Sequence, residues 1–448
     1  MACETINHQP FPPKNARAAI EKQVWKKQET IRRLLRWAVF AMQFPMTSNE
    51  SSLELTIESV AYRGKGIARH DGLVVFVPET LPGERVVAEI VARRKRHAEA
   101  RALRVTKASP DRAVPDCPLF GSCPGCVYQH ARYGEEVRIK QDQLANFLRR
   151  TAAWQEDATV GEPVPSPLET GYRNKIVLHS AVHVGAAPVL GYVGEDNRTV
   201  VDVSHCPLAR PEIGQRLAEL RSQPSFLNSL PDGEDITLRH TVADGTLVWV
   251  GESSPGKERL EEESPWGPLR VPRLGFFQVN PALIPAVTEA IQAELAALGS
   301  DTVLDLYCGC GLLSLAATHA GAKRVIGVDS DAKAIRFAQA NVRKLGTAAE
   351  SVFIAGRCRD LLPNALRDIA PARTAIVADP PRRGLEPAVL DMIGRSAVPA
   401  LLYVSCAADT LARDLNRLAG FGFRLRAARL FDMFPRTPYF ESLAVLAR

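Results

Sequence analysis

The sequence Ala-Leu-Leu-Tyr-Val-Ser-Cys, residues 400–406, decides the fold because an apolar run ends there in a hydroxyl and a thiol. An earlier apolar run, residues 375–378, ends in the same way at Asp379-Pro-Pro. Buried strands of a parallel α/β sheet end like this where the next residues emerge at the ligand-binding edge. We therefore predict that Asp379 and Cys406 lie at neighbouring strand ends and form a catalytic pair.

A strand-like run also leads into a glycine turn, Cys-Gly-Cys-Gly at residues 308–311, which is suited to holding a nucleotide-like cofactor. A dinucleotide fold needs a third glycine for helix packing, and Ser314 stands at that position. Asp329, at the end of the next apolar run, is placed to bond a ribose diol of either NAD or S-adenosylmethionine. Together with Asp305 and Asp379, the pattern favours S-adenosylmethionine.

The C-terminal part, residues 269–448, alternates predicted helices and strands, which is typical of βαβ units and a parallel sheet. A chain of 448 residues is too long for one ordinary core, so we expect two or three domains. No apolar stretch reaches about 18 residues, so no membrane span is expected. Nine cysteines without a signal peptide favour the cytoplasm, and metal or catalytic roles over disulfides. The net charge of +6 fits a polyanionic partner but is weak evidence alone.

Residues 49–108 are predicted to form a small barrel of the oligonucleotide-binding type, because several short alternating strands are separated by glycine turns. The basic run at residues 93–97 is either a solvated hairpin or a contact to RNA, and the sequence leaves both open. Residues 1–48 are expected to be a disordered extension with no fixed role.

Three cysteines within ten residues, Cys117, Cys123 and Cys126, are kept apart by Pro and Gly, and Cys206 follows much later. The C-x5-C-x2-C spacing suits a 4Fe–4S cluster better than the paired knuckles of structural zinc. Zinc remains the competing interpretation, and free buried thiols are the least favoured. Cys206 as fourth ligand would tie two segments together within a mixed, mainly β, domain over residues 109–268.

Tyr172, Arg173 and Lys175 stand at the start of a run of strands in this middle domain. Two interpretations are equally favoured. The side chains contact RNA phosphates, or they are surface residues of an edge strand.

Cys406 precedes a predicted helix, residues 409–418, whose N-terminus is expected to lower the pKa of the thiol. A thiolate nucleophile is needed where the carbon to be methylated is not itself nucleophilic, as at C5 of uracil. Addition at C6 makes C5 an enolate-like centre that attacks a sulfonium methyl group, and a base must then remove the C5 proton. Glu441, in a proline-constrained loop before the last apolar strand, is the candidate base, and Asp379 would orient the pyrimidine or the cofactor.

Two stretches of the predicted barrel, residues 57–68 and 78–84, resemble the TRAM domain, an RNA-binding barrel attached to RNA-modifying enzymes. Residues 52–448 as a whole resemble the RNA uracil-5-methyltransferase family, in the branch that has a TRAM domain and a 4Fe–4S cluster and acts on 23S ribosomal RNA. The motifs behind this resemblance are Phe-x-Gln-Val-Asn, Leu-Asp-x-x-Cys-Gly, Asp-Pro-Pro-Arg, Val-Ser-Cys and Phe-Pro-x-Thr-x-x-x-Glu-Ser.

The resemblance implies an α/β chain whose catalytic domain is a class I, Rossmann-like methyltransferase. It implies S-adenosylmethionine and a 4Fe–4S cluster as cofactors, 23S ribosomal RNA as the partner, and a monomer. Cys406 would be the nucleophile and Glu441 the proton-abstracting base. The implied cluster ligands are Cys117, Cys123, Cys126 and Cys206. The implied cofactor contacts are Gln278, Tyr307, Asp329 and Asp379.

Three positions depart from the family pattern. Leu312 stands where an Asn often follows the glycine turn, and Tyr439 stands where a His is frequent. After Cys406, the usual Asn-Pro is replaced by two alanines, at residues 407–408. None of these changes removes a reacting group, so activity is still expected.

Three alternatives remain at this point. The first is the same chemistry on a transfer RNA uridine. The second is a non-catalytic RNA-binding protein that retains the fold, which would predict the loss of Cys406, Glu441 or Asp379, and all three are present. The third is a nicotinamide-dependent iron–sulfur oxidoreductase, against which the missing third glycine argues.

Overall fold

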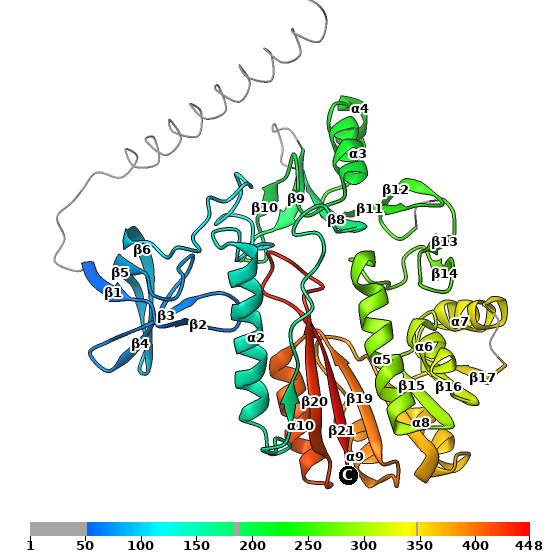
Figure 1. The fold of residues 1–448 in the computed structure, drawn as a ribbon. Helices are drawn as coiled ribbons and strands as arrows, with labels where there is room; N and C mark the ends of the chain where they lie inside the picture. Colours follow the sequence, from blue (N-terminus) through cyan, green and yellow to red (C-terminus); the bar gives the residue numbers. More distant parts are fainter. Residues whose placement is uncertain (1–51, 183–187, 254, 346–347) are drawn as a thin grey trace, which may run out of the picture. The chain divides into compact units, whose positions relative to one another are not determined.

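The computed structural model describes residues 52–448, apart from short gaps at residues 183–187, 254 and 346–347 (Figure 1). The extension predicted over residues 1–48 lies outside the described residues. In the described part, every helix is too short or too polar to cross a membrane.

A six-stranded sheet forms the N-terminal part of the described chain, with the strand order β1-β5-β6-β4-β3-β2. Alternate side chains point inward, and Leu55, Val75, Val77 and Val86 are buried in its core. The basic run at residues 93–97 forms the exposed tip between two antiparallel strands, so the predicted hairpin is confirmed. The strands are β1 Ser52–Thr56, β2 Ser59–Val60, β3 Gly66–His70, β4 Leu73–Val77, β5 Arg85–Arg93 and β6 His97–Lys107.

The middle of the chain contains a five-stranded antiparallel sheet with the order β10-β9-β8-β11-β12. Two helices accompany it, and Ile213 and Leu217 pack with Leu178 and Leu238 of the sheet. Lys175 begins the central strand β8, so the predicted edge-strand position is wrong. The elements are β8 Lys175–Ala181, β9 Val189–Val193, β10 Val200–Asp202, α3 Pro211–Arg221, α4 Pro224–Ser229, β11 Asp235–Thr241 and β12 Gly245–Val250, followed by the hairpin β13 Arg259–Glu262 and β14 Leu269–Pro272.

The C-terminal part is built on an eight-stranded sheet with the order β17-β16-β15-β18-β19-β21-β20-β7. The strands from β15 to β19 are parallel to one another, as the βαβ pattern predicted, and β21 inserts antiparallel between β19 and β20. These strands are β7 Thr159–Val160, β15 Thr302–Leu306, β16 Arg324–Asp329, β17 Glu350–Ala355, β18 Thr374–Ala378, β19 Ala400–Ser405, β20 Arg424–Phe431 and β21 Glu441–Ala447.

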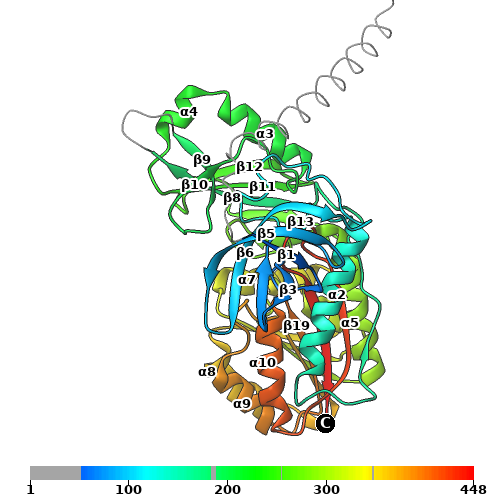
Figure 2. The same cartoon turned by 90° about the vertical axis from the view of Figure 1, so that its left-hand side faces the viewer.

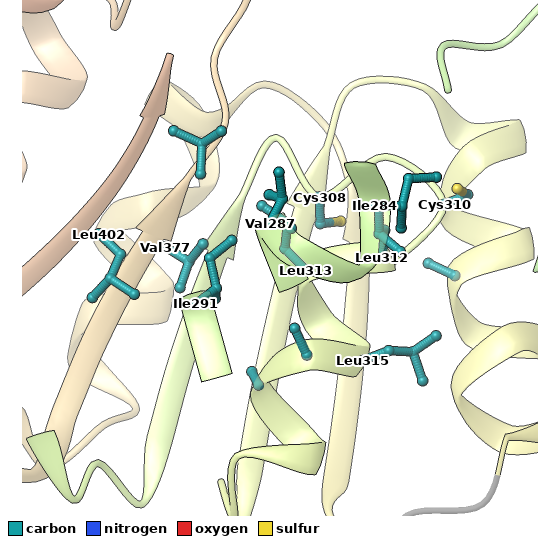
Figure 3. Close-up of a cluster of buried hydrophobic side chains, with 14 of the residues drawn as sticks. Ile284, Val287, Ile291, Cys308, Cys310, Leu312, Leu313, Leu315, Val377 and Leu402 are labelled. Atoms are coloured by element: carbon teal, nitrogen blue, oxygen red, sulfur yellow. The ribbon is translucent and has the colours of Figure 1, made fainter. Parts of the chain in front are cut away.

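Helices cover both faces of this sheet (Figure 2). One face packs against α5, α6 and α7, and the other against α8, α9 and α10. Figure 3 shows Cys308 and Cys310 of the glycine turn among the apolar side chains of the first face, where both are buried. The helical elements are η1 Pro281–Leu283, α5 Ile284–Leu298, α6 Leu312–His319, α7 Ala332–Lys344, α8 Cys358–Arg367, η2 Pro371–Arg373, α9 Pro387–Arg395 and α10 Ala408–Ala419.

Two elements from the middle of the chain join this C-terminal core, which the sequence did not indicate. Helix α2 (Tyr133–Arg149) packs Leu144 and Leu148 into the second face. Strand β7 pairs in parallel with β20 at the sheet edge. The core that supports the C-terminal sheet therefore includes residues that precede position 269.

Candidate active site

Three candidate reacting groups meet at one edge of the C-terminal sheet. Asp379 directly follows β18, and Cys406 directly follows β19, its parallel neighbour. Glu441 is the first residue of β21, which pairs antiparallel with β19 so that Ser405 lies opposite Ser442. The sequence predicted that Glu441 lies in the loop before the last strand. That position is wrong, because Glu441 is part of the strand itself. The sheet register brings the predicted acid, thiol and base together.

Burial and mutual repulsion determine the charge state of the two carboxyl groups. Glu441 is 4% exposed, and its Oε1 has no hydrogen-bond partner among the described residues. Burial, and then the nearby Asp379, raise the pKa of Glu441 well above its ordinary value. Burial, and then Asp329, raise the pKa of Asp379 to about 7. A carboxylate with a raised pKa is a stronger base, which suits proton abstraction.

The electrostatics of Cys406 correct a prediction made from the sequence. Burial, followed by repulsion from Glu441 and Asp379, raises the pKa of the thiol to about 12, and Arg382 opposes this rise. Helix α10 begins at Ala408, and its N-cap residue, Ala407, has no capping side chain. The expected lowering of the pKa by the helix N-terminus is thus outweighed by burial and by the two carboxylates.

The glycine turn is fixed by the acid at the end of β16. One carboxylate oxygen of Asp329 accepts a hydrogen bond from the amide of Gly309 at 2.9 Å, and the other accepts one from the amide of Asp331 at 2.8 Å. Gly309 and Gly311 have φ angles of 52° and 87°, a region that favours glycine. Tyr307 also has a positive φ, of 64°, and its buried hydroxyl faces the Cys358 thiol. This strained position at the end of β15 is typical of a ligand-binding turn.

Ser314, which stands where a dinucleotide fold would have its third glycine, bonds to a buried carboxyl group. Its hydroxyl donates a 2.5 Å hydrogen bond to Oδ2 of Asp305, which is fully buried in β15. Burial raises the pKa of Asp305 to about 7, against the effect of the Ser314 hydrogen bond. The sequence pointed to Asp305 but gave no signal for this pairing, because the two residues meet only after strand and helix fold together.

The segment that contains Gln278 is tied to the middle sheet and to the loop before Glu441. The side-chain amide of Asn280 is buried and donates to Oγ of Ser166 at 3.0 Å and to the carbonyl of Met433 at 3.4 Å. Asn174 donates to the carbonyl of Gln278 at 3.4 Å. Gln278 itself is half-buried.

The four candidate cluster cysteines come together from two segments. Burial is the main cause of the raised pKa values of Cys117, Cys123 and Cys126, and the Cys206 thiol contributes to each rise. Within the described residues, no group of three or more His, Cys, Asp or Glu side chains is arranged to hold a metal ion. A 4Fe–4S cluster differs from a single ion, because its four cysteines bind four different iron atoms and need not converge on one point.

Polar groups without other partners surround these sulfurs. Nε2 of Gln129 and the hydroxyl of Tyr192 are buried and bond to no nitrogen or oxygen atom of the described residues. The Gln129 amide faces the Cys126 sulfur, where its hydrogen bond opposes the effect of burial on the pKa of the thiol. The Tyr192 hydroxyl faces the Cys206 sulfur, and burial and then Cys206 raise the pKa of Tyr192. Buried donors that face cysteine sulfurs fit a site in which the thiolates are metal-bound.

Tyr172 does not form part of the RNA-facing surface that the sequence left open. Tyr172 is 2% exposed, and its hydroxyl donates to the carbonyl of Pro435 at 3.0 Å. Arg173 stacks near the Tyr172 ring and opposes the raised pKa values of Cys123 and Cys126, so it faces the cysteines. For Tyr172 both interpretations are wrong, because its side chain is buried, whereas a contact of the half-buried Arg173 with RNA stays a prediction.

Two family profiles match the chain. The family described as tRNA (Uracil-5-)-methyltransferase matches residues 270–448, and the TRAM domain matches residues 49–103. These ranges coincide with the part of the chain that contains the three reacting groups and with the six-stranded sheet.

Curated proteins of similar length resemble the chain throughout. One from Acidithiobacillus ferrooxidans, named 23S rRNA (uracil(1939)-C(5))-methyltransferase RlmD, is 32% identical over 89% of this chain and 98% of that protein. An uncharacterized RNA methyltransferase of Halalkalibacterium halodurans is 31% identical over 90% of this chain and 98% of that protein.

A solved structure shares the fold. It is Pyrococcus abyssi tRNA (uracil-54, C5)-methyltransferase in complex with S-adenosyl-L-homocysteine, with a TM-score of 0.65 and 23% identity. The match covers 88% of this chain and 100% of that one. Together with the TRAM match, it confirms the predicted fold class, a class I methyltransferase sheet preceded by a TRAM domain.

Proposed function

This chain belongs to the RNA uracil-5-methyltransferase family, and we propose that it transfers the methyl group of S-adenosylmethionine to C5 of a specific uridine in 23S ribosomal RNA. The observation behind this proposal is the convergence of Asp379, Cys406 and Glu441 beside the glycine turn. The ribosomal target is taken from the A. ferrooxidans relative, whose name states it.

In the proposed reaction, the Cys406 thiol first loses its proton to bulk water, and the thiolate forms a bond from Sγ to C6 of the uracil. The electron pair of the C5–C6 double bond moves toward C5 and O4, so C5 becomes nucleophilic. C5 then takes the methyl group. Glu441 removes the C5 proton, the double bond re-forms, and the C6–S bond breaks to return the thiolate. The high pKa of Glu441 strengthens it as this base.

The cofactor supplies an electrophilic sulfonium methyl group when it is bound. Four residues around the glycine turn are proposed to hold it. Asp329 is placed for a ribose, because it lies at the end of β16 and binds the amide of Gly309. Tyr307 directly precedes the glycine turn and has a positive φ of 64°. Gln278 and Asp379 complete the set.

The cysteines are proposed to hold a 4Fe–4S cluster, with a zinc site as the competing assignment. The buried polar groups of Gln129 and Tyr192, which face the Cys126 and Cys206 sulfurs, support metal-bound thiolates. Uracil methylation needs no electron transfer, so the cluster would have a structural role. The ligands would be Cys117, Cys123, Cys126 and Cys206.

The proposal includes a monomeric cytoplasmic enzyme whose partner is RNA and which has no membrane association. Transfer RNA is the second candidate substrate, because the family profile and the P. abyssi protein are named for it. Family membership and the presence of Cys406 and Glu441 argue against a nicotinamide-dependent oxidoreductase and against a non-catalytic RNA-binding protein.

Methyl transfer from labelled S-adenosylmethionine to separate, unmodified ribosomal and transfer RNA pools tests the function. Label in 5-methyluridine of large-subunit RNA is the expected result. Label in transfer RNA would overturn the substrate but keep the chemistry, and no label in either pool would overturn the activity. A covalent adduct with 5-fluorouridine RNA should form with the native chain and be absent from Cys406→Ala.

A further inference from the structure

Arg382 and Tyr439 form a stacked pair beside the candidate active site. The guanidinium carbon lies 4.0 Å from the centroid of the Tyr439 ring, within the range of a cation–π interaction. Arg382 follows Asp379 by three residues, and Tyr439 precedes Glu441 by two. The pair therefore joins the two loops that bring the acid and the base to the thiol.

The charge balance of the site makes this pair important. The thiolate that the reaction requires has to form beside Glu441 and Asp379, and both carboxylates oppose it. Among the described residues, Arg382 is the cation that lowers the pKa values of both Cys406 and Glu441. Its charge offsets part of the repulsion that burial strengthens.

The ring of Tyr439 is what holds this guanidinium. The Arg382 backbone is fixed, because its carbonyl accepts from Oγ1 of Thr410 at 3.0 Å and Gly384 closes the turn onto Pro381. The side chain is exposed, and its guanidinium makes no hydrogen bond or ion pair with any described residue. A long, exposed arginine has many conformers, so stacking selects the one that places its charge by the site.

We propose that Tyr439 is a positioning residue that holds Arg382 in place so that the arginine charge promotes the Cys406 thiolate. This inference rests on the proposed function, in which Cys406 is the nucleophile. The ring, rather than the tyrosine hydroxyl, provides the contact. Three charged or titratable groups act on Cys406: Glu441 from β21, and Asp379 and Arg382 from the loop after β18. Asp409 of α10 is paired with Arg63 at 3.7 Å.

The test is the pH dependence of Cys406 alkylation by iodoacetamide in the full-length, cluster-loaded protein without RNA. The peptide containing Cys406 is quantified by mass spectrometry, which separates it from the other cysteines. Arg382→Ala should move the profile to higher pH and slow alkylation at a fixed pH by about tenfold, the effect of one pKa unit. Tyr439→Leu should move the profile in the same direction and slow alkylation at a fixed pH by about three- to tenfold.

Tyr439→Phe is the matched control, because it keeps the ring and loses only the hydroxyl, and its profile should match that of the native chain. Arg382→Lys keeps the charge without the planar stack and should lie between native and Arg382→Ala. An unchanged profile for Arg382→Ala, or equal profiles for Tyr439→Phe and Tyr439→Leu, would overturn the inference. Thermal unfolding of each variant excludes a folding defect as the cause.

Methyl transfer to RNA is measured on the same preparations to separate the two proposals. If the native chain methylates no RNA, but the alkylation profiles of the variants shift as expected, the function is overturned and the role of the pair stays intact. A native chain that methylates RNA while the alkylation profiles coincide overturns the role of the pair alone.

Discussion

The backbone amide of Val127 donates a hydrogen bond to the carbonyl oxygen of Arg436, 2.9 Å away. Val127 directly follows Cys126, and Arg436 stands five residues before Glu441. The amide of Tyr128 shares the same acceptor at 3.2 Å, and the Arg436 amide donates to Glu136 at 2.6 Å. The cysteine segment and the loop that leads to the candidate base are thus one hydrogen-bonded unit.

If the proposed cluster is present, its removal should loosen the loop before Glu441. Chelation of the metal, or Cys126→Ser, is expected to free Val127 and to raise hydrogen exchange at residues 434–440, because their anchor is lost. The measurement is exchange detected by mass spectrometry, before and after chelation.

The variant supplies its own control, since a chelator should add nothing to the exchange of Cys126→Ser. Unchanged exchange at residues 434–440 in metal-free protein would show that the protein contacts alone hold this loop.

A buried ion cluster should make a larger contribution to stability than the surface pairs. Lys140 of α2 is fully buried, and its Nζ lies 2.7 Å from both Glu136 and Asp432. Lys140→Met would leave the buried Asp432 carboxylate without its cation and Glu136 with Arg436 alone, which costs about 3–5 kcal/mol in the free energy of unfolding. Chemical denaturation measures this loss.

Arg138→Ala is the comparison, because Arg138 lies two residues away on the same helix and is exposed in its pairs with Glu135 and Asp142. Its loss should cost about 0–1 kcal/mol. If the two variants lose the same free energy of unfolding, the buried Lys140 cluster stabilises the fold no more than apolar side chains of the same size would.

The sequence predicted the parts of the site that depend on local patterns. An apolar run that ends in Asp379 or Cys406 marks a strand end, and the parallel sheet then brings such ends together. The βαβ alternation likewise predicted the core sheet, because helix and strand periodicities are visible within short windows.

The remaining features depend on contacts between distant residues. Lys140 pairs with Asp432 across 292 positions, and nothing near either residue indicates the other. The pKa of Cys406 rises because folding buries the thiol and β21 then brings Glu441 near it, and these effects outweigh the nearby helix start. The stacking of Arg382 on Tyr439 also requires the folded loops. Charge states in a buried site are set by tertiary structure, so sequence patterns alone mispredict them.

Glu441→Gln should separate methyl transfer from enzyme release. The amide cannot remove the C5 proton, so the C6–S bond to Cys406 cannot break, and a methylated covalent complex should accumulate. Turnover is expected to fall by about 10²–10⁴-fold, the usual contribution of a general base. A denaturing gel with labelled cofactor reveals the complex as RNA-linked protein.

The double variant Cys406→Ala with Glu441→Gln should form no such complex, which identifies the linking residue. Rapid turnover by Glu441→Gln would assign proton removal to another group, and Asp379 would be the next candidate because of its raised pKa.

Asp305 should make the stability of the chain fall as the pH rises. Its carboxyl group is fully buried, and burial raises its pKa from 3.8 to about 7 in the folded chain. The folded state therefore binds the proton more tightly than the unfolded state, so the stabilisation is complete below the unfolded pKa and is lost as the pH rises through about 7. The upper bound of the effect is about 4 kcal/mol, from about three pKa units.

Asp305→Asn cannot ionise, so its melting temperature should depend less on pH between acidic and mildly alkaline solution. Asp301→Asn, at a half-buried carboxyl just before the same strand, should retain the native pH dependence near pH 7, because Lys323 and Arg373 lower the pKa of Asp301 against the effect of burial. Parallel profiles for the native chain and Asp305→Asn would mean that Asp305 stays ionised when buried, with Ser314 alone compensating for its charge.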